Sequence, residues 1–476
     1  MQYKGLSAIQ GSLIVAEGVH NPVYGEIVDI DPYKKTGRVV RIHGDKVVIQ
    51  VFEGTHNMSL ENTKTRFTGK PLQLGLSPDI LGRVFDGLGR PIDSLGPIIG
   101  ELARDINGSA INPVAREYPR SFIQTGISAI DGLITLIRGQ KLPIFSGDGL
   151  PHNRIAAQIL RQSALGGSNT DIELSSFSHK HSESNPLESR SYEREPFAIV
   201  FGAMGVQQDT AEYFRNVLTE AAGMDRVSMF INIAKDPVVE RIATPRAALT
   251  AAEYLAYDLG MHVLVILTDM TAYAEALREL SSSQGEIPSR KGYPGYLYSE
   301  LSSIFERAGI LRGKQGSITQ IPILSMPGDD ITHPIPDLTG FITEGQIVLD
   351  RGLFQKGIYP PIRVLPSLSR LMKDGIGEGY TRADHPDLAN QLFASYARVE
   401  EVRALARVIG EEELNETDQK FMKYGEAFEN QFLNQPEYDN RSVTETLDLA
   451  WELLEILPKS QLTRIRAEVL EKYGSR

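Results

Sequence analysis

The chain has 476 residues, 41% hydrophobic and 23% charged, which is an ordinary globular composition with room for two to four domains. It contains no cysteine, so disulfides, thiolate nucleophiles and cysteine zinc sites are excluded. Its formal net charge of −12 argues against a nucleic-acid partner, and its longest apolar runs are too short to cross a membrane, so we expect a cytoplasmic location.

Residues 1–76 carry short, regularly spaced β-branched segments. Turn signals such as Asn-Pro and Asp-Pro separate the predicted strands, which are residues 13–16, 25–30, 37–42 and 46–52. Several strands at such close spacing favour a small barrel, because closing a sheet removes its edges. We predict an all-β N-terminal domain over residues 1–76.

Residues 77–375 change to strands that alternate with helical stretches. The predicted strands are 141–145, 196–201, 227–233 and 262–267, and the predicted helices are 153–165, 210–222 and 237–259. This alternation is typical of a parallel sheet covered by helices on both faces. We predict a central α/β domain over residues 77–375.

From residue 376 onward the chain is mostly helical and charged. Apolar residues recur at helical spacing over 386–409, 412–431 and 443–457. Proline interrupts the pattern at Pro436 and Pro458. The expected domain over residues 376–476 is a helical bundle.

The segment 166–195 differs from the rest of the central domain. It is rich in Ser, Asn, His and Glu and almost devoid of apolar residues, which predicts a solvated, mobile loop. His179 and His181 in this loop could share a metal, but two exposed loop histidines are the simpler interpretation. No metal site is predicted.

The predicted strand, turn and helix over residues 141–165 have the layout of a phosphate-binding loop. In such loops, backbone N–H groups and the positive end of a helix face an anion. A working loop reads G-x-x-x-x-G-K-[ST], where the lysine reaches the β- and γ-phosphates and the hydroxyl holds Mg²⁺. Residues 146–153 read SGDGLPHN, in which Gly147 and Gly149 keep the glycine character. Taken alone, this stretch favours an ordinary strand–helix turn.

The residues that would handle phosphate are replaced. Pro151 stands in place of the last glycine and has no N–H to donate. His152 stands in place of the lysine and is mostly neutral at cytoplasmic pH, while Asn153 replaces the hydroxyl. Asp148 adds a negative charge close to the position of the phosphates.

A second element makes a degenerate nucleotide site more persuasive. Residues 262–269 (HVLVILTD) form an apolar strand that ends in Asp269, which is the layout of the Walker B element that steadies magnesium. Two βα units separate this strand from the loop. The candidate nucleotide-site residues are therefore Gly147, Gly149, His152, Asn153 and Asp269.

The sequence resembles the B subunits of V-type and archaeal-type rotary ATPases over essentially its whole length. The matching stretches are residues 82–93 (GRVFDGLGRPID), 142–153 (LPIFSGDGLPHN), 290–298 (RKGYPGYLY) and 329–340 (DDITHPIPDLTG). The first is typical of rotary ATPases in general, and the others are more specific. The resemblance implies an N-terminal β-barrel in a crown, a RecA-like central α/β domain with a parallel sheet, and a C-terminal helical domain that faces the rotor.

The resemblance also implies an assembly. Three A and three B subunits alternate in a ring around a central rotor stalk, with peripheral stalks, and ATP or ADP with magnesium lies where A meets B. The A subunits carry the working phosphate loop, and ATP turnover is coupled to proton or sodium transport. In such an assembly the ring of A and B subunits is cytoplasmic, and it is connected to the membrane only through the rest of the complex.

The same family places a catalytic glutamate after a Gly-x-Gly turn in its active subunits. The matching position here is near Val206, and valine cannot accept or orient a proton. We expect this chain to be non-catalytic on its own and to bind no nucleotide tightly by itself.

Two further residues take roles from the resemblance. Residues 366–370 (PSLSR) look like the family's arginine-finger motif, so Arg370 is expected to reach the catalytic site of the neighbouring A subunit. Without the resemblance it would be read as a surface arginine near a turn. Tyr359 occupies the place where related subunits put an aromatic ring against adenine, although a packed core tyrosine is nearly as good an interpretation.

Three other functions stay open at this point. The alpha subunit of an F-type synthase generally keeps a Gly-Lys-Thr loop, which residues 151–153 lack. A self-sufficient hexameric P-loop ATPase, such as a protein-export or nucleic-acid motor, would need a lysine at His152 and a carboxylate near Val206. In a purely structural ring subunit, Arg370 would have no chemical role.

Overall fold

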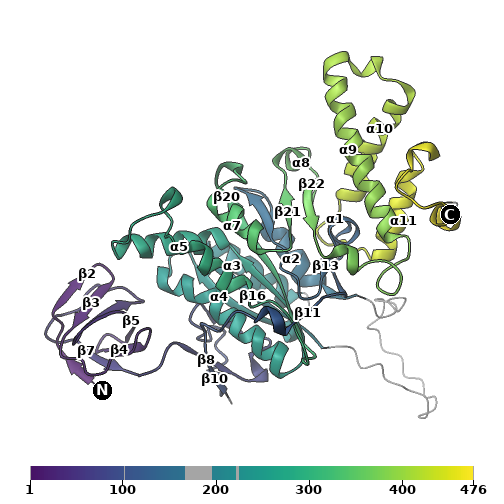
Figure 1. The fold of residues 1–476 in the computed structure, drawn as a ribbon. Coiled ribbons are helices and arrows are strands. Elements are labelled where there is room, and N and C mark those ends of the chain that lie inside the picture. The colour runs from purple at the N-terminus through teal and green to yellow at the C-terminus, as the bar shows by residue number, and fades with distance from the viewer. Residues whose placement is uncertain (1, 101, 167–195, 221–223, 475–476) are drawn as a thin grey trace, which may run out of the picture.

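The computed structural model describes residues 2–100, 102–166, 196–220 and 224–474. These residues form three parts that follow one another along the chain (Figure 1). The polar segment predicted as a loop lies outside the described residues from position 167 to 195, and so do His179 and His181. Within the described ranges, no helix is both long enough and apolar enough to span a membrane.

The N-terminal part is a seven-stranded antiparallel sheet that curls into a small barrel (purple in Figure 1). Inward-facing residues such as Val28, Ile30, Val39 and Ile49 are fully buried, as expected for the apolar face of a closed sheet. The predicted β-barrel is confirmed. Its strands, in the order β1-β7-β4-β5-β6-β3-β2, are β1 Gln2–Lys4, β2 Ala8–Gln10, β3 Leu13–Ala16, β4 Ile27–Asp31, β5 Lys35–His43, β6 Lys46–Val51 and β7 Lys64–Phe67.

The central part is built on a mostly parallel sheet in the order β22-β21-β14-β20-β18-β16-β17-β9. Only the edge strand β22 in this row runs antiparallel to its neighbour, β21. The predicted parallel α/β domain is thereby confirmed. The strands are β9 Val84–Asp86, β14 Ile144–Gly147, β16 Phe197–Val206, β17 Val227–Ile233, β18 His262–Thr268, β20 Ser317–Met326, β21 Gly345–Leu349 and β22 Ile362–Ser369.

Short strands surround this sheet. β8 Gln73–Leu76 pairs with β10 Leu102–Asp105, outside the barrel. β19 Gly309–Leu311 pairs antiparallel with β20 of the central sheet and with β11 Arg116–Glu117. β12 Phe122–Gln124 lies between β13 Leu136–Ile137 and β15 Ala164–Leu165 in a separate small sheet.

Helices cover both faces of the sheet because successive strand residues point to opposite sides. Ile144, Ile199 and Leu264 pack with α2, α3 and the C-terminal helices, whereas Phe145 and Val200 face α4 to α7. The central helices are α1 Ser128–Leu133, α2 His152–Gln162, α3 Gln208–Glu220, α4 Val238–Glu253, α5 Met270–Ser283, α6 Leu297–Phe305, α7 Pro334–Ile342 and α8 Arg351–Gln355.

Some predicted boundaries were wrong. The strand expected at 141–145 begins at Ile144 and runs to Gly147, because Pro143 has no N–H for the sheet. Lys141 makes only an isolated bridge to Gln320. The helix expected over 412–431 begins at Glu416, where the Asn415 side chain accepts the N–H of Asp418 and caps it.

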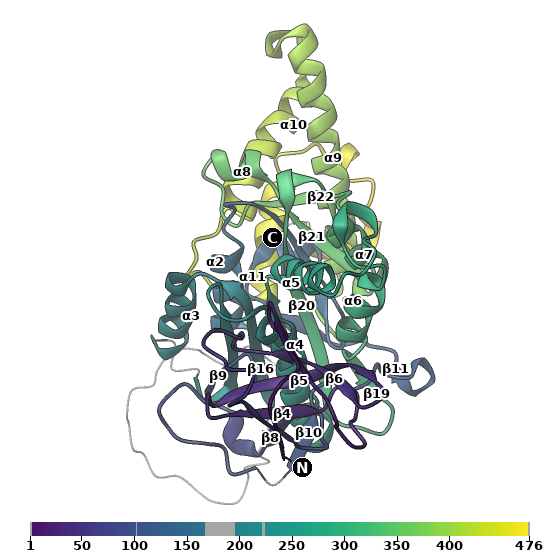
Figure 2. The same cartoon turned by 90° about the vertical axis from the view of Figure 1, so that its left-hand side faces the viewer.

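The C-terminal part is a helical domain, as predicted. Its long hairpin of α9 and α10 projects from the body at the end opposite the barrel (Figures 1 and 2). Tyr396 of α9 and Tyr424 of α10 both pack against Phe428, which directly follows α10, and all three are buried. The helices are α9 His385–Ile409, α10 Glu416–Ala427, α11 Val443–Leu454 and α12 Ala467–Tyr473.

Buried polar contacts join the central and C-terminal parts. Gln435 is fully buried, and its amide accepts the Ser128 N–H at 2.9 Å and donates to the Gly126 carbonyl at 2.6 Å. His385 is also fully buried, and its Nε2 lies 3.0 Å from the Gly132 carbonyl. A neutral imidazole with its proton on Nε2 satisfies this contact.

We expect His385 to make the protein acid-sensitive. Burial lowers the pKa of His385 to about 4, so between this value and an ordinary pKa of about 6.5 the unfolded chain binds a proton that the folded chain does not. The free energy of unfolding should therefore keep its full value above pH 7. It should decrease by on the order of 3 kcal/mol as the pH falls toward 4.

Urea unfolding of the wild-type chain and of His385→Gln at pH 7 and pH 4.5 measures this effect. The glutamine variant should lose less stability on acidification than the wild type, because an amide does not titrate. His43→Gln, at an exposed histidine of the barrel, is the control. Equal acid sensitivity of the wild type and His385→Gln would contradict the expectation.

Candidate functional site

The strand, turn and helix of the candidate phosphate loop are present. β14 ends at Gly147, and α2 begins at His152. The His152 N–H donates to the Leu150 carbonyl at 2.9 Å, and the Leu150 N–H donates to the Gly147 carbonyl at 3.2 Å. In a working loop such donors face the phosphates. Because Pro151 has no N–H at all, the turn offers an anion fewer donors than a working loop does.

His152 is turned back into the loop. Its Nδ1 lies 3.0 Å from Oγ of Ser146, a fully buried residue whose hydroxyl also contacts the Gly147 carbonyl. Burial lowers the pKa of His152, although Asp269 and Asp148 oppose the shift. The imidazole is therefore neutral at pH 7, and it supplies no positive charge to a phosphate.

A carboxylate approaches the loop where its glycine is retained. A Cβ on Gly147 would lie 2.0 Å from Oδ1 of Asp329, so a larger residue at this position would displace that carboxylate. Arg351 holds this carboxylate with two bonds of 2.7 and 2.8 Å and donates to the Asp148 carbonyl at 2.9 Å. Arg351 also lowers the pKa of Asp329. The loop thus packs against an ion pair of its own chain.

Asp269 follows β18 as predicted, but its oxygens are engaged. Oδ1 accepts the N–H groups of Thr271 at 2.7 Å and Ser325 at 3.1 Å, and Oδ2 accepts the Ser325 hydroxyl at 2.5 Å. The carboxylate caps α5 and ties it to β20. Asn153 Oδ1 is buried and has no hydrogen-bond partner among the described residues. This set does not fit a magnesium nucleotide held by this chain alone.

Val206 is the last residue of β16 and is buried. Beside it, Arg241 Nε donates to Asn232 Oδ1 at 3.0 Å, and Arg241 Nη2 donates to the Ala234 carbonyl at 3.1 Å. The position expected for a catalytic glutamate therefore carries only an apolar side chain, and Arg241 is engaged by oxygens of this chain. Among the described residues, no group of three His, Asp or Glu could hold a metal ion.

Tyr359 lies against α2 and is covered by an arginine. The Arg154 guanidinium sits 4.5 Å from its ring centroid, and the Tyr359 hydroxyl donates to Gln158 Oε1 at 3.0 Å. Glu437, from the C-terminal part, pairs with Arg154 at 2.7 Å and accepts the Tyr213 hydroxyl at 2.7 Å. A base could stack on the covered face of this ring only after Arg154 had moved away.

The structure thus brings together most of the residues proposed from the sequence. Gly147, Gly149, His152 and Asn153 form one turn, and Asp269 is close enough to influence the pKa of His152. The residues that fill the site were missed, and they are Asp329, Arg351, Arg154 and Glu437. The positions of Asp329 and Arg351 after β20 and β21 were the available signal, since ligand-facing residues follow the carboxyl ends of parallel strands.

Arg370 is placed differently from these arginines. It follows the edge strand β22 and is exposed. Its Nη1 lies 3.5 Å from the Thr343 carbonyl, and within the described part of the chain no carboxylate pairs with it. The guanidinium is therefore free to meet an anion outside this chain.

The register of β22 separates Arg370 from the loop of its own chain. β22 runs antiparallel to β21, so Ile362 pairs with Leu349 at the carboxyl edge and Ser369 pairs with Gly345 at the opposite edge. Gly147 lies at the carboxyl edge, because its neighbour Phe145 pairs with Val348. At a rise of about 3.3 Å per residue, the two edges are about 15 Å apart along the strands.

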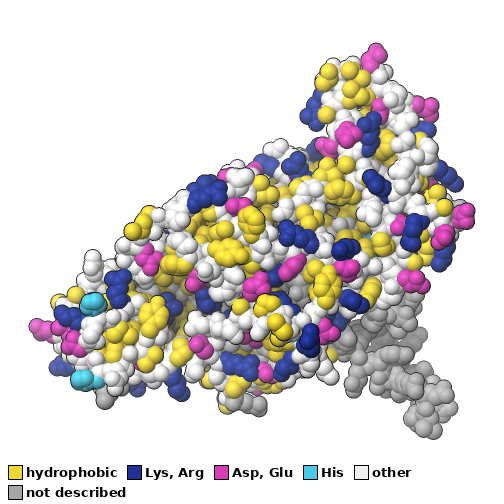
Figure 3. All heavy atoms as spheres, viewed as in Figure 1, with side chains coloured by type: hydrophobic (Ala, Val, Ile, Leu, Met, Phe, Trp, Pro, Cys, Tyr) yellow, Lys and Arg dark blue, Asp and Glu magenta, His cyan; other side chains and the backbone are white. Residues whose placement is uncertain are grey.

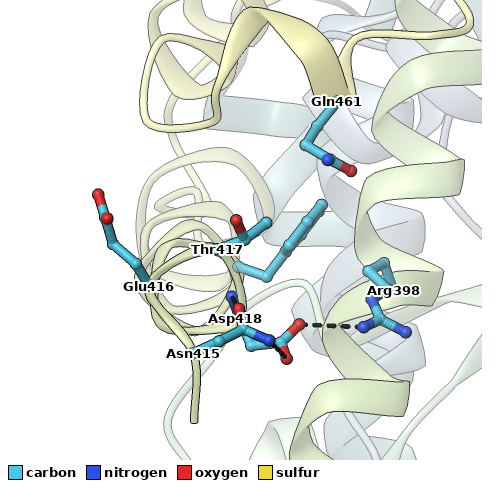
Figure 4. Close-up of a pocket in the computed structure, with 7 residues that line it drawn as sticks. Arg398, Asn415, Glu416, Thr417, Asp418 and Gln461 are labelled. Carbon is cyan, nitrogen blue, oxygen red and sulfur yellow. Dashed lines mark hydrogen bonds and ion pairs between the residues drawn. The ribbon is translucent and has the colours of Figure 1, made fainter.

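A surface pocket lies away from the candidate phosphate loop and from Arg370. It is formed by the start of α10, by α9 and by Gln461 (Figure 4). Its arginine, Arg398, pairs with Asp418 at 3.0 Å and with Glu401 at 2.8 Å. Glu416 adds another exposed acid to its rim. The pocket has no unpaired cation among its lining residues and is not suited to a nucleotide.

Family models match the three parts of the chain. Residues 126–369 match the nucleotide-binding domain of the ATP synthase alpha/beta family, and residues 6–69 match its β-barrel domain. Residues 374–474 match the C-terminal domain of V and A type ATP synthase.

Known proteins are similar over nearly the full length. The chain is 59% identical to V-type ATP synthase beta chain 2 of Clostridium tetani, covering 99% of this chain and 98% of that one. It is 58% identical to the V-type ATP synthase beta chain of Thermotoga neapolitana, with the same coverage. A solved structure described as a unique ATP synthase subunit, NeqB, from Nanoarcheaum equitans is 37% identical, with a TM-score of 0.70, and the match covers 93% of this chain and 98% of that one.

We expect the isolated chain to bind ATP weakly or not at all, because the turn lacks an N–H donor, a cation and a hydroxyl. Pro151→Gly, His152→Lys and Asn153→Thr together would restore these groups. Hydrogen bonds to charged groups contribute about 1.5–3 kcal/mol each, so the triple variant should bind at least about tenfold more tightly.

Calorimetric titration with ATP and magnesium measures both affinities. His152→Lys alone is the control, and it should gain less than the triple variant because the donor and the hydroxyl are still missing. Micromolar binding by the wild-type chain that disappears in His152→Ala would show that this loop holds nucleotide after all.

Proposed function

The chain belongs to the ATP synthase alpha/beta family as a V-type beta chain, the B subunit of a rotary V/A-type ATPase, and we propose that it is the non-catalytic partner of an A-type catalytic subunit. Three copies alternate with three A subunits in a ring. ATP or ADP with magnesium lies at the A–B contact, where Arg370 completes the catalytic site of the neighbour.

The observation that carries this proposal is the position of Arg370. The guanidinium is exposed, has no carboxylate partner among the described residues, and extends from the edge of the sheet opposite the loop of its own chain. A cation in this position serves a site on another subunit better than a site on its own.

Guanidinium suits the task for two physical reasons. It stays protonated at every physiological pH, and its planar fork of N–H groups matches the oxygens of a phosphate. In phosphoryl transfer the protein mainly neutralises charge that develops on the transferred group, and no proton need pass through the arginine. Such an arginine contributes roughly 10³–10⁵ in rate, or about 4–7 kcal/mol of the activation barrier.

The loop of this chain supports a division of labour between the subunits. Its lysine position holds a neutral histidine, and its magnesium-side carboxylate is used in capping α5. The A subunit would supply the lysine, the magnesium ligands and the glutamate that polarises water. This argues against a self-sufficient P-loop motor.

The remaining parts fit the same assembly. In the proposal, the barrel joins the crown of the ring and the α9–α10 hairpin at the opposite end faces the central rotor (Figure 2). Peripheral stalks hold the ring, whose turnover is coupled to proton or sodium transport at the membrane. The head itself lies on the cytoplasmic side. On the face in Figure 3, Lys and Arg side chains are interspersed with Asp and Glu, which is unlike a nucleic-acid groove.

The proposal is tested by measuring ATP turnover in three samples. These are the chain alone, the chain mixed with its A subunit, and the Arg370→Ala variant mixed with the A subunit. We expect no turnover alone, strong turnover in the mixture, and a loss of about a thousandfold or more in the Arg370→Ala mixture. Arg363→Ala is a matched control, since Arg363 lies on β22, which Arg370 directly follows, is 61% exposed and sits at the other edge of the sheet. It should leave turnover largely unchanged.

Two results would contradict the proposal in different ways. Robust turnover by the chain alone would make it a catalytic ATPase with an unusual phosphate site. Unchanged turnover of the assembled Arg370→Ala ring would leave the chain as a purely structural subunit.

A further inference from the structure

We infer that Lys141 is a positioning residue for Arg370. Lys141 lies under the edge of the sheet from which Arg370 extends, and through Glu344 it fixes the backbone that carries the guanidinium. The inference rests on the proposed function, because it concerns how the arginine offered to the neighbouring subunit is held.

Lys141 and Glu344 are joined at three points. The Lys141 N–H donates to Glu344 Oε2 at 2.8 Å, and the Lys141 Nζ lies 2.8 Å from Glu344 Oε1. The Glu344 N–H donates back to the Lys141 carbonyl at 3.1 Å. Both oxygens of the carboxylate are thus tied to one residue, which leaves the Glu344 side chain little freedom to rotate.

Glu344 in turn holds Arg370. The Arg370 N–H donates to the Glu344 carbonyl at 2.9 Å, and the Arg370 Nη1 lies 3.5 Å from the carbonyl of the preceding residue, Thr343. Gln140 Nε2 donates to the same Glu344 carbonyl at 3.0 Å and to Ser369 Oγ at 2.9 Å. The backbone on which Arg370 stands is therefore bound to Glu344 directly and through Gln140.

Gly345, the residue after Glu344, allows a close contact between this turn and the end of β22. Gly345 has a φ of 150°, and a Cβ there would lie 2.3 Å from the Leu368 carbonyl. The turn at 343–345 therefore lies in close backbone contact with the end of β22. Displacing Glu344 would displace Arg370 as well.

Lys141 also neutralises the negative charge of neighbouring carboxylates, and its own side chain is buried. Its side chain is 3% exposed, and Nζ also lies 2.8 Å from Glu306, which Arg116 contacts at 2.5 Å. Two cations and two carboxylates therefore form a neutral group. Without Lys141, Glu344 would face the like charge of Glu306 with no cation between them, and the two carboxylates would separate.

A shift of the Arg370 backbone would impair the chemical step more than nucleotide binding. A misplacement of about 1 Å can reduce a rate by about a hundredfold. Nucleotide affinity depends mainly on the loop of the A subunit in the proposed assembly. Loss of Lys141 should therefore lower kcat and leave KM for ATP nearly constant.

The experiment compares Lys141→Met, Arg370→Ala and the double variant in the ring reconstituted with the A subunit. Lys141→Met should reduce kcat by about tenfold to a hundredfold, with little change in KM. In the Arg370→Ala background, the same substitution should cause no further loss, because there is no guanidinium left to position. Lys46→Met, which removes an ion pair of the barrel with Glu17, is the control and should leave kcat unchanged.

The double-variant comparison separates positioning from general destabilisation. If Lys141→Met lowers kcat by the same factor with and without Arg370, its role is merely structural and the inference fails. If Arg370→Ala abolishes turnover while Lys141→Met leaves it unchanged, the inference also fails although the proposed function stands. If Arg370→Ala has no effect, the proposed function itself fails.

If rings that contain Lys141→Met do not assemble, the Glu344→Gln variant provides the test instead. The amide keeps the size of the side chain and removes its charge, so the ion pair with Lys141 is lost while the backbone carbonyl of residue 344 remains. We expect a smaller drop in kcat that again vanishes in the Arg370→Ala background. A drop that persists in that background would overturn the inference.

Discussion

The reversal of one edge strand sets the relation between the two functional edges of this protein. β22 runs against β21, so the chain passes from the carboxyl edge at Ile362 to the opposite edge at Ser369. The loop at Gly147 stays at the carboxyl edge, because the neighbouring strands around β14 are parallel. The strand order therefore places Arg370 at the edge away from its own loop, whatever side chain stands at this position. In the proposed ring, an arginine at this edge would serve a site on a neighbour rather than its own loop.

The degenerate site is filled by pairs that contribute little to stability. Arg351 and Asp329 are 42% and 43% exposed, and exposed ion pairs are worth about 0–1 kcal/mol. A pair this weak would not by itself keep out a triphosphate. The missing donors matter more, since each charge-assisted hydrogen bond contributes about 1.5–3 kcal/mol. The predicted loss of anion affinity would therefore come mainly from Pro151 and the neutral His152, with a smaller part from the ion pair.

The sequence predicted those features that depend on local patterns. The strand at 227–233 matched its observed bounds, because a short, mostly apolar segment of strand length between two helical stretches gives both its position and its length. The loop around Gly147 was located for a similar reason, since its strand, turn and helix are contiguous. Arg351 was missed because it meets Asp148 across 203 positions of sequence, and Lys141 was missed because it meets Glu344 across a similar separation. Such contacts follow from strand order and from turns such as the left-handed Gly328 and Asp329, which no local pattern specifies.

The two edges of the sheet also differ in how their cations are used. At the carboxyl edge, Arg351, Arg154 and Arg241 each donate to a carboxylate or an oxygen of this chain. An anion arriving there would have to break those contacts before it gained its own. At the opposite edge, Lys141 is paired with two carboxylates in a neutral group, while the Arg370 side chain is exposed. Among the described residues, a phosphate from another subunit would compete at the guanidinium with the 3.5 Å contact of Nη1 to the Thr343 carbonyl. Arg370 thus has no carboxylate partner among the described residues, whereas the arginines of the carboxyl edge are engaged within this chain, and this is the charge arrangement that the proposed role of Arg370 requires.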